Sequence, residues 1–319
     1  MNNSVMNICM ISDNNYSMYT GIALTSLKEN KNPDSYYKIY ILTDYMDEEN
    51  KNHLLSLNDN KFNIEIITVN GYEKYYKELE IEHISARPVS LYKFKIPEIL
   101  DFLDIVLYID GDILFEKDIY ELFSTDLGEY YAAVTPENII GTEPPPNCQR
   151  IESSHLVYFN SGLMLLNLEK MRRDNIPEKL IHYRIYGKNF LMDQDAFNAV
   201  IGDNVLCLSP LYFTAYYEIN DPKNFIKYGC KSKKEIIKKS YILHLATKNK
   251  PWVKKQPWIT KEYIKYHRMS PFKKIAIVPS TYLNQYYNQL YDKLEGKVVF
   301  NIARRIVRLF RRKPRLYDK

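Results

Sequence analysis

Short apolar runs and helical spacings alternate along the first part of the chain. Residues 7–11, 37–42 and 64–69 form apolar or β-like runs that predict strands. The stretch after the first run, up to Leu27, and residues 48–57 instead place apolar side chains at helical intervals. This order of strand, helix and strand is typical of a parallel sheet with covering helices, so we expect an α/β fold.

The most distinct strand pattern follows at residues 104–109, where DIVLYI runs directly into Asp110, Gly111 and Asp112. A polar cluster at residues 12–16 follows the first predicted strand in the same way. Ligands of open α/β sheets bind beyond the carboxyl ends of the strands. We therefore expect both clusters to lie at the ligand-binding edge of the sheet.

The middle of the chain continues this pattern. Residues 92–100 predict a helix that accommodates Pro97, and residues 193–201 predict another. A further strand is expected within residues 156–168. Residues 142–150, with the sequence TEPPPNCQR, have the composition of a surface loop or a lid.

A strongly basic segment follows the main domain. Of the net charge of +5, residues 297–319 carry +8, which leaves −3 for residues 1–296. We expect a main domain at residues 1–270 and a helical, basic tail at residues 271–319. As a helix, the tail has an apolar face and an arginine-rich face, which is typical of a helix lying on an anionic membrane. A helix packed on the main domain is the alternative.

Composition and the remaining signals favour a globular enzyme of the cytoplasm. Hydrophobic residues make up 45% and charged residues 26% of the chain, which is ordinary for a globular protein. The amino-terminal sequence lacks a signal-peptide pattern, and no stretch approaches the roughly 20 apolar residues of a membrane span. The four cysteines show no zinc spacing and indicate a reducing compartment. With the basic tail, this predicts a peripheral protein at the inner face of the cell membrane.

Asp110 and Asp112 carry the most informative chemistry. Two carboxylates separated by one glycine, at the end of a buried strand, can both reach one hard divalent cation. Gly111 lets the backbone bend and lets a diphosphate come close. A cation held there would offset the charge of a nucleotide diphosphate and stabilise it as a leaving group. Because Asp-Gly is also a favoured turn dipeptide, a hairpin turn is the alternative for this motif taken alone.

The segment LYIDGDILF resembles the strand and acidic motif of glycosyltransferase family 8, and further blocks between about residues 7 and 252 extend the resemblance. It implies the GT-A fold of nucleotide-diphospho-sugar transferases, a Rossmann-like mixed sheet flanked by helices. It also implies retaining transfer of a hexose from a UDP-sugar. The family includes bacterial galactosyl- and glucosyltransferases that extend lipopolysaccharide.

The first of these blocks is Ser12-Asp13-Asn14-Asn15-Tyr16. By resemblance, Asp13 and Asn15 bond to uracil and ribose, and the Tyr16 ring stacks on the base. The alternative is a helix N-cap cluster, because Asp and Asn are favoured caps.

Two central blocks resemble the part of the family site that faces the donor sugar. Lys93 stands where the family has an arginine that contacts the donor, and lysine lacks the bidentate fork of arginine. In the sequence FNSG, Asn160 would bond sugar hydroxyls and Gly162 would leave room for the ring. A solvated helix face for Lys93 and a strand bulge at Gly162 are the alternatives.

Asp193-Gln194-Asp195 resembles the DQD block of the family. Asp193 would bind donor hydroxyls, and Gln194 would lie near the anomeric carbon on the face opposite the leaving group. Because glutamine is a poor nucleophile, we favour attack on the same face, assisted by the departing phosphate, over a covalent glycosyl-enzyme. A helix N-cap is the alternative for Asp193.

The last block, HLATKNKPW, begins at His244. By resemblance, His244 is the third protein ligand of the cation, and Lys250 binds the diphosphate. Thr247 departs from the glycine of the family. The ligand set favours Mn²⁺, with Mg²⁺ as the alternative.

These blocks lead to one main hypothesis and two alternatives. The main hypothesis is a transferase that moves galactose or glucose from a UDP-sugar to a glycan or lipid-linked glycan acceptor, in lipopolysaccharide or other cell-surface polysaccharide synthesis. A metal-dependent nucleotidyltransferase would instead release pyrophosphate. A nucleic-acid-binding protein would use the basic tail. The negative charge of residues 1–296 and the joint presence of the DGD, DQD and HxxxxxKPW blocks count against nucleic acid as a partner.

Overall fold

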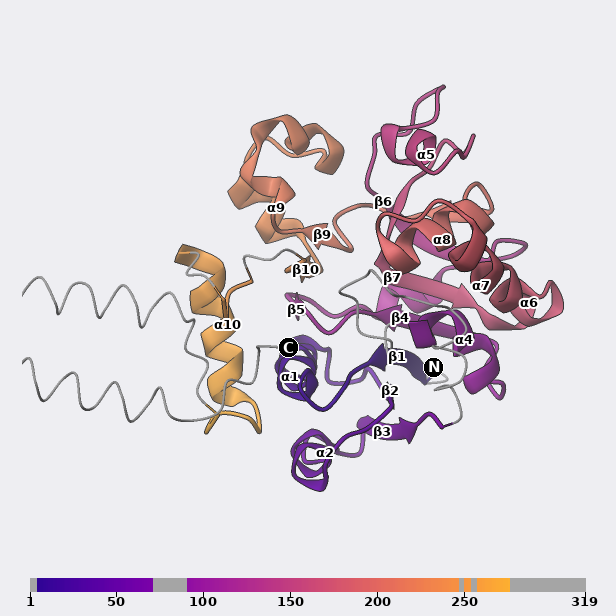
Figure 1. Ribbon diagram of the computed structural model, residues 1–319. Helices are drawn as coiled ribbons and strands as arrows, with labels where there is room; N and C mark the ends of the chain where they lie inside the picture. The colour runs from indigo at the N-terminus through magenta and orange to yellow at the C-terminus, as the bar shows by residue number, and fades with distance from the viewer. Residues whose placement is uncertain (1–4, 71–90, 247–249, 254–256, 276–319) are drawn as a thin grey trace, which may run out of the picture. The chain divides into compact units, whose positions relative to one another are not determined.

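A computed structural model describes residues 5–70, 91–246, 250–253 and 257–275 (Figure 1). They fall into two compact units. The first contains the described residues up to 246 together with residues 263–275, and the second contains residues 250–253 and 257–262. Most of the predicted basic tail, residues 276–319, lies outside the described residues, so its helix and its membrane contact stay predictions.

Seven strands form the central sheet of the first unit, in the order β3-β2-β1-β4-β7-β6-β8 among the described residues. β1 pairs in parallel with β2 and β4, whereas β7 runs antiparallel to β4 and β6. β8 is parallel to β6. One edge of the sheet therefore contains the amino end of β7 and the carboxyl ends of β1, β4, β6 and β8. The strand bounds are Met6–Ile11 (β1), Tyr37–Thr43 (β2), Phe62–Thr68 (β3), Ile105–Ile109 (β4), Ala132–Pro136 (β6), Phe159–Asn167 (β7) and Val205–Cys207 (β8).

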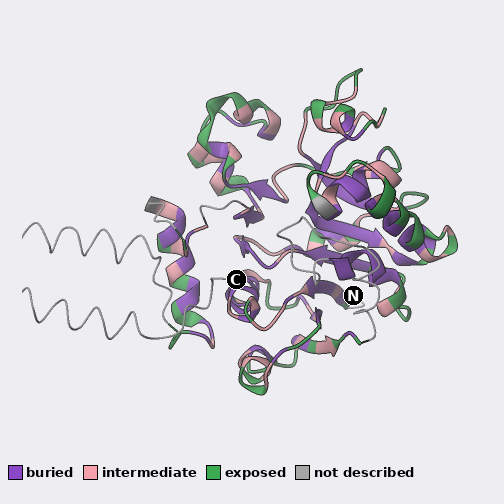
Figure 2. Cartoon of the chain, viewed as in Figure 1, coloured by how far each residue is buried: buried purple, intermediate pink, exposed green. Residues whose placement is uncertain are grey.

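Both faces of this sheet are buried. Successive side chains along a strand belong in turn to two apolar clusters, one on each face. In β4, Val106 and Tyr108 belong to one cluster, and Leu107 and Ile109 belong to the other. Side chains of a strand point to opposite faces in turn, so each face needs its own cover of helices. Figure 2 shows the resulting buried centre of the unit.

Helices supply that cover from different parts of the chain. Leu24 of α1 and Leu54 of α2 join the cluster of Leu107, whereas Phe94 of α4 and Phe197 of α8 join the cluster of Val106. The helix bounds are Ser17–Asn30 (α1), Glu48–Leu55 (α2), Tyr92–Ile99 (α4), Pro146–Arg150 (α5), Leu168–Arg173 (α6), Ile176–Tyr186 (α7), Met192–Ile201 (α8), Lys233–Lys239 (α9) and Pro257–Met269 (α10). The 3-10 helices are Tyr120–Ser124 (η2), Glu218–Asn220 (η3) and Pro222–Tyr228 (η4).

A second, three-stranded sheet, in the order β5-β10-β9 among the described residues, continues from the end of β4. Its strands are Ile113–Phe115 (β5), Thr214–Ala215 (β9) and Ile242–His244 (β10). β10 pairs antiparallel with β5, so His244 lies opposite Ile113, and Leu245 donates its backbone N–H to the carbonyl oxygen of Asp112 at 2.9 Å. A strand from late in the sequence thus runs beside the acidic motif.

The predicted elements agree with the observed ones in type and, to within two residues, at most of their ends. The mixed sheet confirms the predicted α/β fold. The prediction of a loop at residues 142–150 is wrong for the second half of that segment, which forms α5. Pro146 lies in the first turn of α5, where its fixed φ angle suits a helix and its missing N–H costs no bond. None of the described helices has both the length and the apolar content that a membrane crossing requires.

Candidate active site

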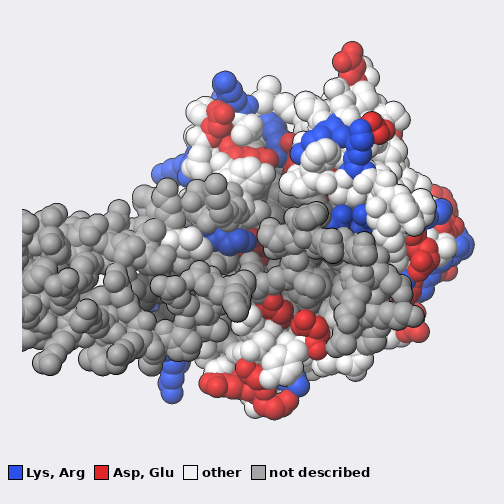
Figure 3. Space-filling view, in the orientation of Figure 1, with Lys and Arg blue, Asp and Glu red and all other residues white. Residues whose placement is uncertain are grey.

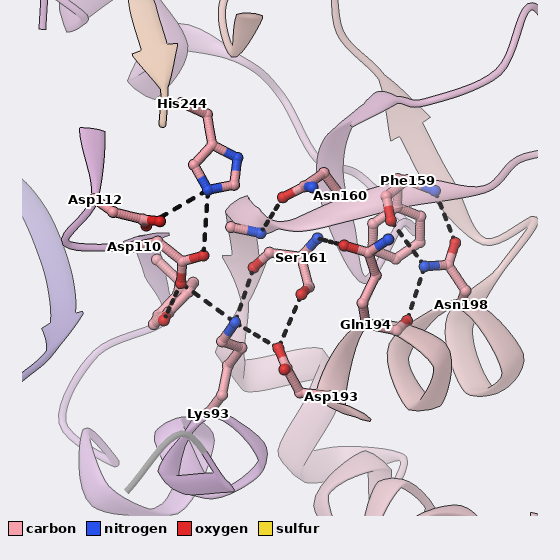
Figure 4. Close-up of polar contacts among 12 residues, drawn as sticks. Lys93, Asp110, Asp112, Phe159, Asn160, Ser161, Asp193, Gln194, Asn198 and His244 are labelled. Atoms are coloured by element: carbon pink, nitrogen blue, oxygen red, sulfur yellow. Dashed lines mark hydrogen bonds and ion pairs between the residues drawn. The ribbon is translucent and has the colours of Figure 1, made fainter. Parts of the chain in front are cut away.

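Asp110, Asp112 and His244 form a cluster that could hold a cation, with one ligand atom of each lying within 4.8 Å of the others (Figure 4). His244 Nε2 lies 3.8 Å from Asp110 Oδ2 and 3.5 Å from Asp112 Oδ1. These separations are too long for good hydrogen bonds but suit three ligands around one ion. The structure thus brings together the three predicted metal ligands, and their oxygen and imidazole atoms fit a divalent cation such as Mn²⁺.

Packing fixes the His244 ring. The imidazole stacks on Phe213 with ring centroids 4.5 Å apart, and the side chain is 3% exposed. Among the described residues, its Nδ1 has no hydrogen-bond partner. A metal-bound histidine usually gives its second nitrogen to an acceptor, so stacking takes over the orienting role at this site.

Lys93 links this cluster to the DQD block. Its ammonium lies 2.5 Å from Asp193 Oδ2 and 3.4 Å from Asp110 Oδ1, and it donates to the carbonyl oxygen of Ser161 at 3.2 Å (Figure 4). An ammonium has three donors, and these contacts use all three. Lys93 therefore holds two carboxylates in place, and the predicted direct contact with the donor sugar stays a prediction. The alternative of a solvated helix face is wrong, because Lys93 is 3% exposed.

Electrostatics keep this lysine charged. Burial alone would lower the pKa of Lys93, but the carboxylates of Asp110 and Asp193 outweigh it and raise the pKa above its usual value. The ammonium also lies 4.5 Å from the centroid of the Tyr108 ring. One cation among Asp110, Asp112 and Asp193 leaves a formal excess of two negative charges, which a divalent ion would neutralise.

Tyr108 is a site residue that sequence reasoning missed. Its hydroxyl donates to Asp110 Oδ1 at 2.7 Å. That oxygen is therefore engaged by Tyr108 and Lys93, while Asp110 Oδ2 faces His244. The alternation of β4 contained the signal, because residues two apart on a strand share a face.

The two glycines leave room for the carboxylates and the first loop. A Cβ atom at Gly162 would lie 2.6 Å from Asp110 Oδ2, and one at Gly111 would lie 2.9 Å from Thr20 Oγ1. Both distances are shorter than side chains tolerate, so neither position accepts alanine without a shift. Gly162 thus makes room for Asp110, and room for a sugar ring there stays a prediction.

Asp193 lies in the first turn of α8 and does not cap that helix. The N-cap residue is Leu191, without a side-chain cap bond, and Asp193 Oδ2 instead accepts from Lys93 and from Ser161 Oγ, the latter at 2.8 Å. The N-cap alternative for Asp193 is therefore wrong. Gln194 is oriented by the backbone N–H of Ser161, which donates to its Oε1 at 3.4 Å (Figure 4).

Neighbouring residues fasten α8 to β7. Asn198 accepts from the backbone N–H of Phe159 and donates to the carbonyl oxygens of Phe159 and Gln194, each at 2.8 Å. Asp195 is fully buried and accepts from the Tyr158 hydroxyl at 2.6 Å. These contacts give the last residue of the DQD block a structural role and hold Gln194 at the sheet edge.

Glu137, which bonds to Asn160, is a second residue near the site that sequence reasoning missed. Its Oε1 accepts from Asn160 Nδ2 at 2.9 Å, while Asn160 Oδ1 accepts from the backbone N–H of Gly162 at 2.8 Å. Burial raises the pKa of Glu137, opposed by the bond from Asn160 and reinforced by the nearby Glu218. A carboxylate with a raised pKa, directly after β6, is a candidate functional group. The signal in the sequence is the short run AAVTP directly before it, which forms β6.

The first loop lies beside the acidic motif. Asp13 Oδ1 accepts from the backbone N–H of Tyr16 at 2.7 Å, Asn15 is exposed, and the Tyr16 ring lies 3.4 Å from the position of a Cβ at Gly111. Asp13 thus closes a local turn before α1, and the N-cap alternative is wrong, because the N-cap residue is Tyr16 and it has no side-chain cap bond. The nucleoside contacts of Asp13, Asn15 and Tyr16 stay predictions. Burial, followed by the charge of Asp112, raises the pKa of Tyr16.

Two predicted residues, Lys250 and Thr247, are not among the described residues of the first unit. Lys250 belongs to the second unit, where its ammonium lies 5.4 Å from the centroid of the Trp252 ring. Its contact with the diphosphate therefore stays a prediction, and Thr247 lies outside the described residues.

Comparisons with known proteins assign the chain to a family. The sequence model of the family Glycosyl transferase family 8 matches residues 7–256. General stress protein A of Bacillus subtilis is 28% identical over 265 residues, which cover 78% of this chain and 87% of that protein. Lipopolysaccharide 1,2-glucosyltransferase of Escherichia coli K12 is 26% identical over 279 residues, covering 84% and 79%.

Among solved structures, the galactosyltransferase LgtC in complex with donor and acceptor sugar analogues is similar, with a TM-score of 0.65 and 20% identity. The match covers 88% of this chain and 99% of that one. This likeness shows that the two proteins share the GT-A fold.

Proposed function

Because the chain belongs to glycosyltransferase family 8, we propose that it moves a hexose, galactose or glucose, from a UDP-sugar to a glycan acceptor with retention of configuration. The proposal rests above all on the convergence of Asp110, Asp112 and His244 within 4.8 Å. These ligands would hold Mn²⁺ or Mg²⁺. When bound, such a cation offsets the charge of the diphosphate and makes it a better leaving group.

The residues around the cluster would position the donor. Lys93 fixes the carboxylates of Asp110 and Asp193, so that Asp110 Oδ2 stays on the side of His244, where it would bind a cation, and the second oxygen of Asp193 would bind donor hydroxyls. Gln194, oriented by the backbone of Ser161, would stabilise positive charge at the anomeric carbon through its side-chain oxygen.

We infer attack on the same face as the leaving group. The carboxylate beside Gln194 that could compete as a nucleophile is Glu137, and its Oε1 is engaged by Asn160. Incubation with a slowly reacting fluorinated UDP-sugar, followed by mass spectrometry of the intact protein, tests this step. A covalent sugar on Glu137 or on any other side chain would overturn it.

The acceptor and the cellular location follow from relatives and from the sequence. Similarity to the lipopolysaccharide glucosyltransferase supports an acceptor that belongs to a cell-surface glycan. The pattern of the basic tail supports attachment at the inner membrane face. Deletion of residues 297–319 should then move the protein to the soluble fraction, and unchanged partition would remove the idea.

The transferase function is tested by donor hydrolysis. The protein is incubated with a panel of UDP-sugars and Mn²⁺, and released UDP is measured. EDTA should reduce UDP release at least about 100-fold, and added Mn²⁺ should restore it. Release of pyrophosphate would favour the nucleotidyltransferase alternative. Figure 3 shows basic and acidic side chains interspersed on the described surface that it draws, which gives the nucleic-acid alternative no support.

A further inference from the structure

An apolar pocket of about 330 Å³ lies next to the candidate active site, at the carboxyl ends of β6 and β8. Its apolar lining includes Ile139, Ile140, Leu208 and Ile226. The three isoleucines are 64%, 49% and 74% exposed. Exposed apolar side chains that gather around a concave site mark a place where an apolar group binds.

The polar side chains of this pocket are already engaged. Asn138 accepts from the backbone N–H of Tyr158 at 2.8 Å and donates to the carbonyl oxygen of Leu156 at 3.1 Å. Lys227 pairs with Glu218 at 2.7 Å. A sugar hydroxyl or a phosphate in the pocket would give up its bonds to water and gain few in return. The lining therefore favours a hydrocarbon occupant.

Three consecutive residues connect the pocket with the candidate active site along the chain. Pro136 and Asn138 line it, and Glu137 between them bonds to Asn160 at 2.9 Å. If the sugar of an acceptor binds at Glu137 and Asn160, the aglycone attached to that sugar would reach the pocket. The volume equals that of about eleven water molecules at about 30 Å³ each, which accommodates several carbons of an alkyl chain.

We propose that this pocket binds the hydrocarbon chain of the acceptor, so that the acceptor is a sugar carried on a lipid or another alkyl aglycone. The proposal rests on the transferase function proposed above. It predicts that affinity for an acceptor rises with the length of its chain, up to the capacity of the pocket.

Cys207 provides a reporter inside the pocket. It lines the pocket and is exposed, whereas Cys9, Cys148 and Cys230, the other cysteines of the chain, are buried. A maleimide should therefore label Cys207 selectively in the folded protein. The probes are methyl, butyl and octyl β-glucosides, each below its micelle concentration, and the measurement is the rate of labelling.

Octyl glucoside should slow the labelling of Cys207, and methyl glucoside should leave it unchanged. Each added methylene should lower the half-protecting concentration by up to about fourfold, from about 0.8 kcal/mol per buried methylene and 1.4 kcal/mol per factor of ten. Protection that does not depend on chain length would overturn the proposal.

Substitutions in the pocket lining test whether the protection of Cys207 arises from binding in this pocket. Ile226→Asn, in η4, should abolish the dependence on chain length, and Ile139→Asn should do the same if the first variant fails to fold. Ile185→Asn is the matched control, because Ile185 is an isoleucine 42% exposed on α7 outside the lining. Equal protection of all variants would exclude the pocket.

Two further measurements separate the remaining outcomes. UDP release by the unmodified protein without glucoside tests the transferase function by itself, so a failed pocket and a failed transferase give different results. Sedimentation velocity detects a second copy as the occupant. The protein could form a dimer that Ile226→Asn dissociates and that octyl glucoside leaves intact. That result would show that a second copy of the chain, and not a lipid chain, occupies the pocket.

Discussion

Substitution of Lys93 by methionine tests whether this buried ammonium holds the site together. The side chain is 4% exposed, and its partners Asp193 and Asp110 are 10% and 29% exposed. Removing one partner of a buried ion pair costs about 3–5 kcal/mol, because the remaining charge is neither solvated nor paired. Methionine keeps the apolar stem, so the loss reports the missing charge.

Lys95→Met is a matched control two residues further along α4. Lys95 is similarly buried, with its side chain 9% exposed, but its partners Glu98 and Glu178 are 43% and 56% exposed. Water can solvate those carboxylates when the lysine is removed, so the expected cost is about 0–1 kcal/mol. The two variants differ mainly in the burial of the partners.

The assay is urea unfolding at pH 7 in EDTA, with melting temperatures as a second readout at about 2–4 °C per kcal/mol. Mn²⁺ should reduce the loss of unfolding free energy caused by Lys93→Met, since the added positive charge compensates for the lost ammonium. If the two variants lose stability to within about 1 kcal/mol of each other, the reasoning from partner burial is wrong.

The raised pKa of Lys93 fixes the expected pH range. A lysine whose pKa is higher in the folded state contributes stability that is fully present below its unfolded value, about 10.4, and lost as the pH rises through the folded value. The difference between Lys93→Met and the unmodified protein should therefore be constant from pH 6 to pH 9. A decline within that range would show that the ammonium titrates early.

Three further substitutions address the groups around Asp110. Tyr108→Phe should weaken Mn²⁺ binding about 10-fold in calorimetry while leaving UDP release at saturating Mn²⁺ nearly unchanged, because it removes only the bond that orients Asp110. Gly162→Ala should reduce both Mn²⁺ binding and UDP release by at least about 10-fold, since its Cβ would displace Asp110 Oδ2. Glu137→Gln should raise the melting temperature more at pH 8 than at pH 4, because a buried carboxyl with a raised pKa costs stability once it ionises.

Each of these has an outcome that would contradict it. Unchanged Mn²⁺ affinity in Tyr108→Phe would show that Lys93 and packing orient Asp110 without this bond. Normal Mn²⁺ binding in Gly162→Ala would mean that the carboxylate can move aside. A pH-independent effect of Glu137→Gln would mean that Glu137 ionises without cost.

The sequence predicted the local parts of this structure well. The strand pattern at residues 104–109 and the acidic pair after it appear at the expected sheet edge, since burial and periodicity are local properties. The polarity of the sheet was only partly predictable. The parallel pairing of β1, β2 and β3 follows from their order, but the reversal of β7 depends on which strands it joins.

The features that periodicity could not predict depend on pairings between parts of the chain that are distant in sequence. The placement of His244 beside Asp112 came from a family resemblance, because nothing in the local sequence reveals that β10 pairs with β5. Glu137 was missed because β6 contains a proline and is only five residues long. Asn160 shows a further limit, since the family resemblance implied sugar contacts for it but gave no sign that its amide also bonds to Glu137 and Gly162.

The pairing of β10 with β5 gives the cation a role in the architecture of the chain. A bound ion would cross-link Asp112 to His244 and close a loop of more than a hundred residues that contains Asn160, Asp193 and Gln194. Closure of such a loop restricts the unfolded chain as a disulfide does, so cation binding and complete folding should be thermodynamically linked. A nascent chain that ends before β10 would have the strands of the large sheet and both aspartates, but would bind the ion tightly only once the last ligand arrives.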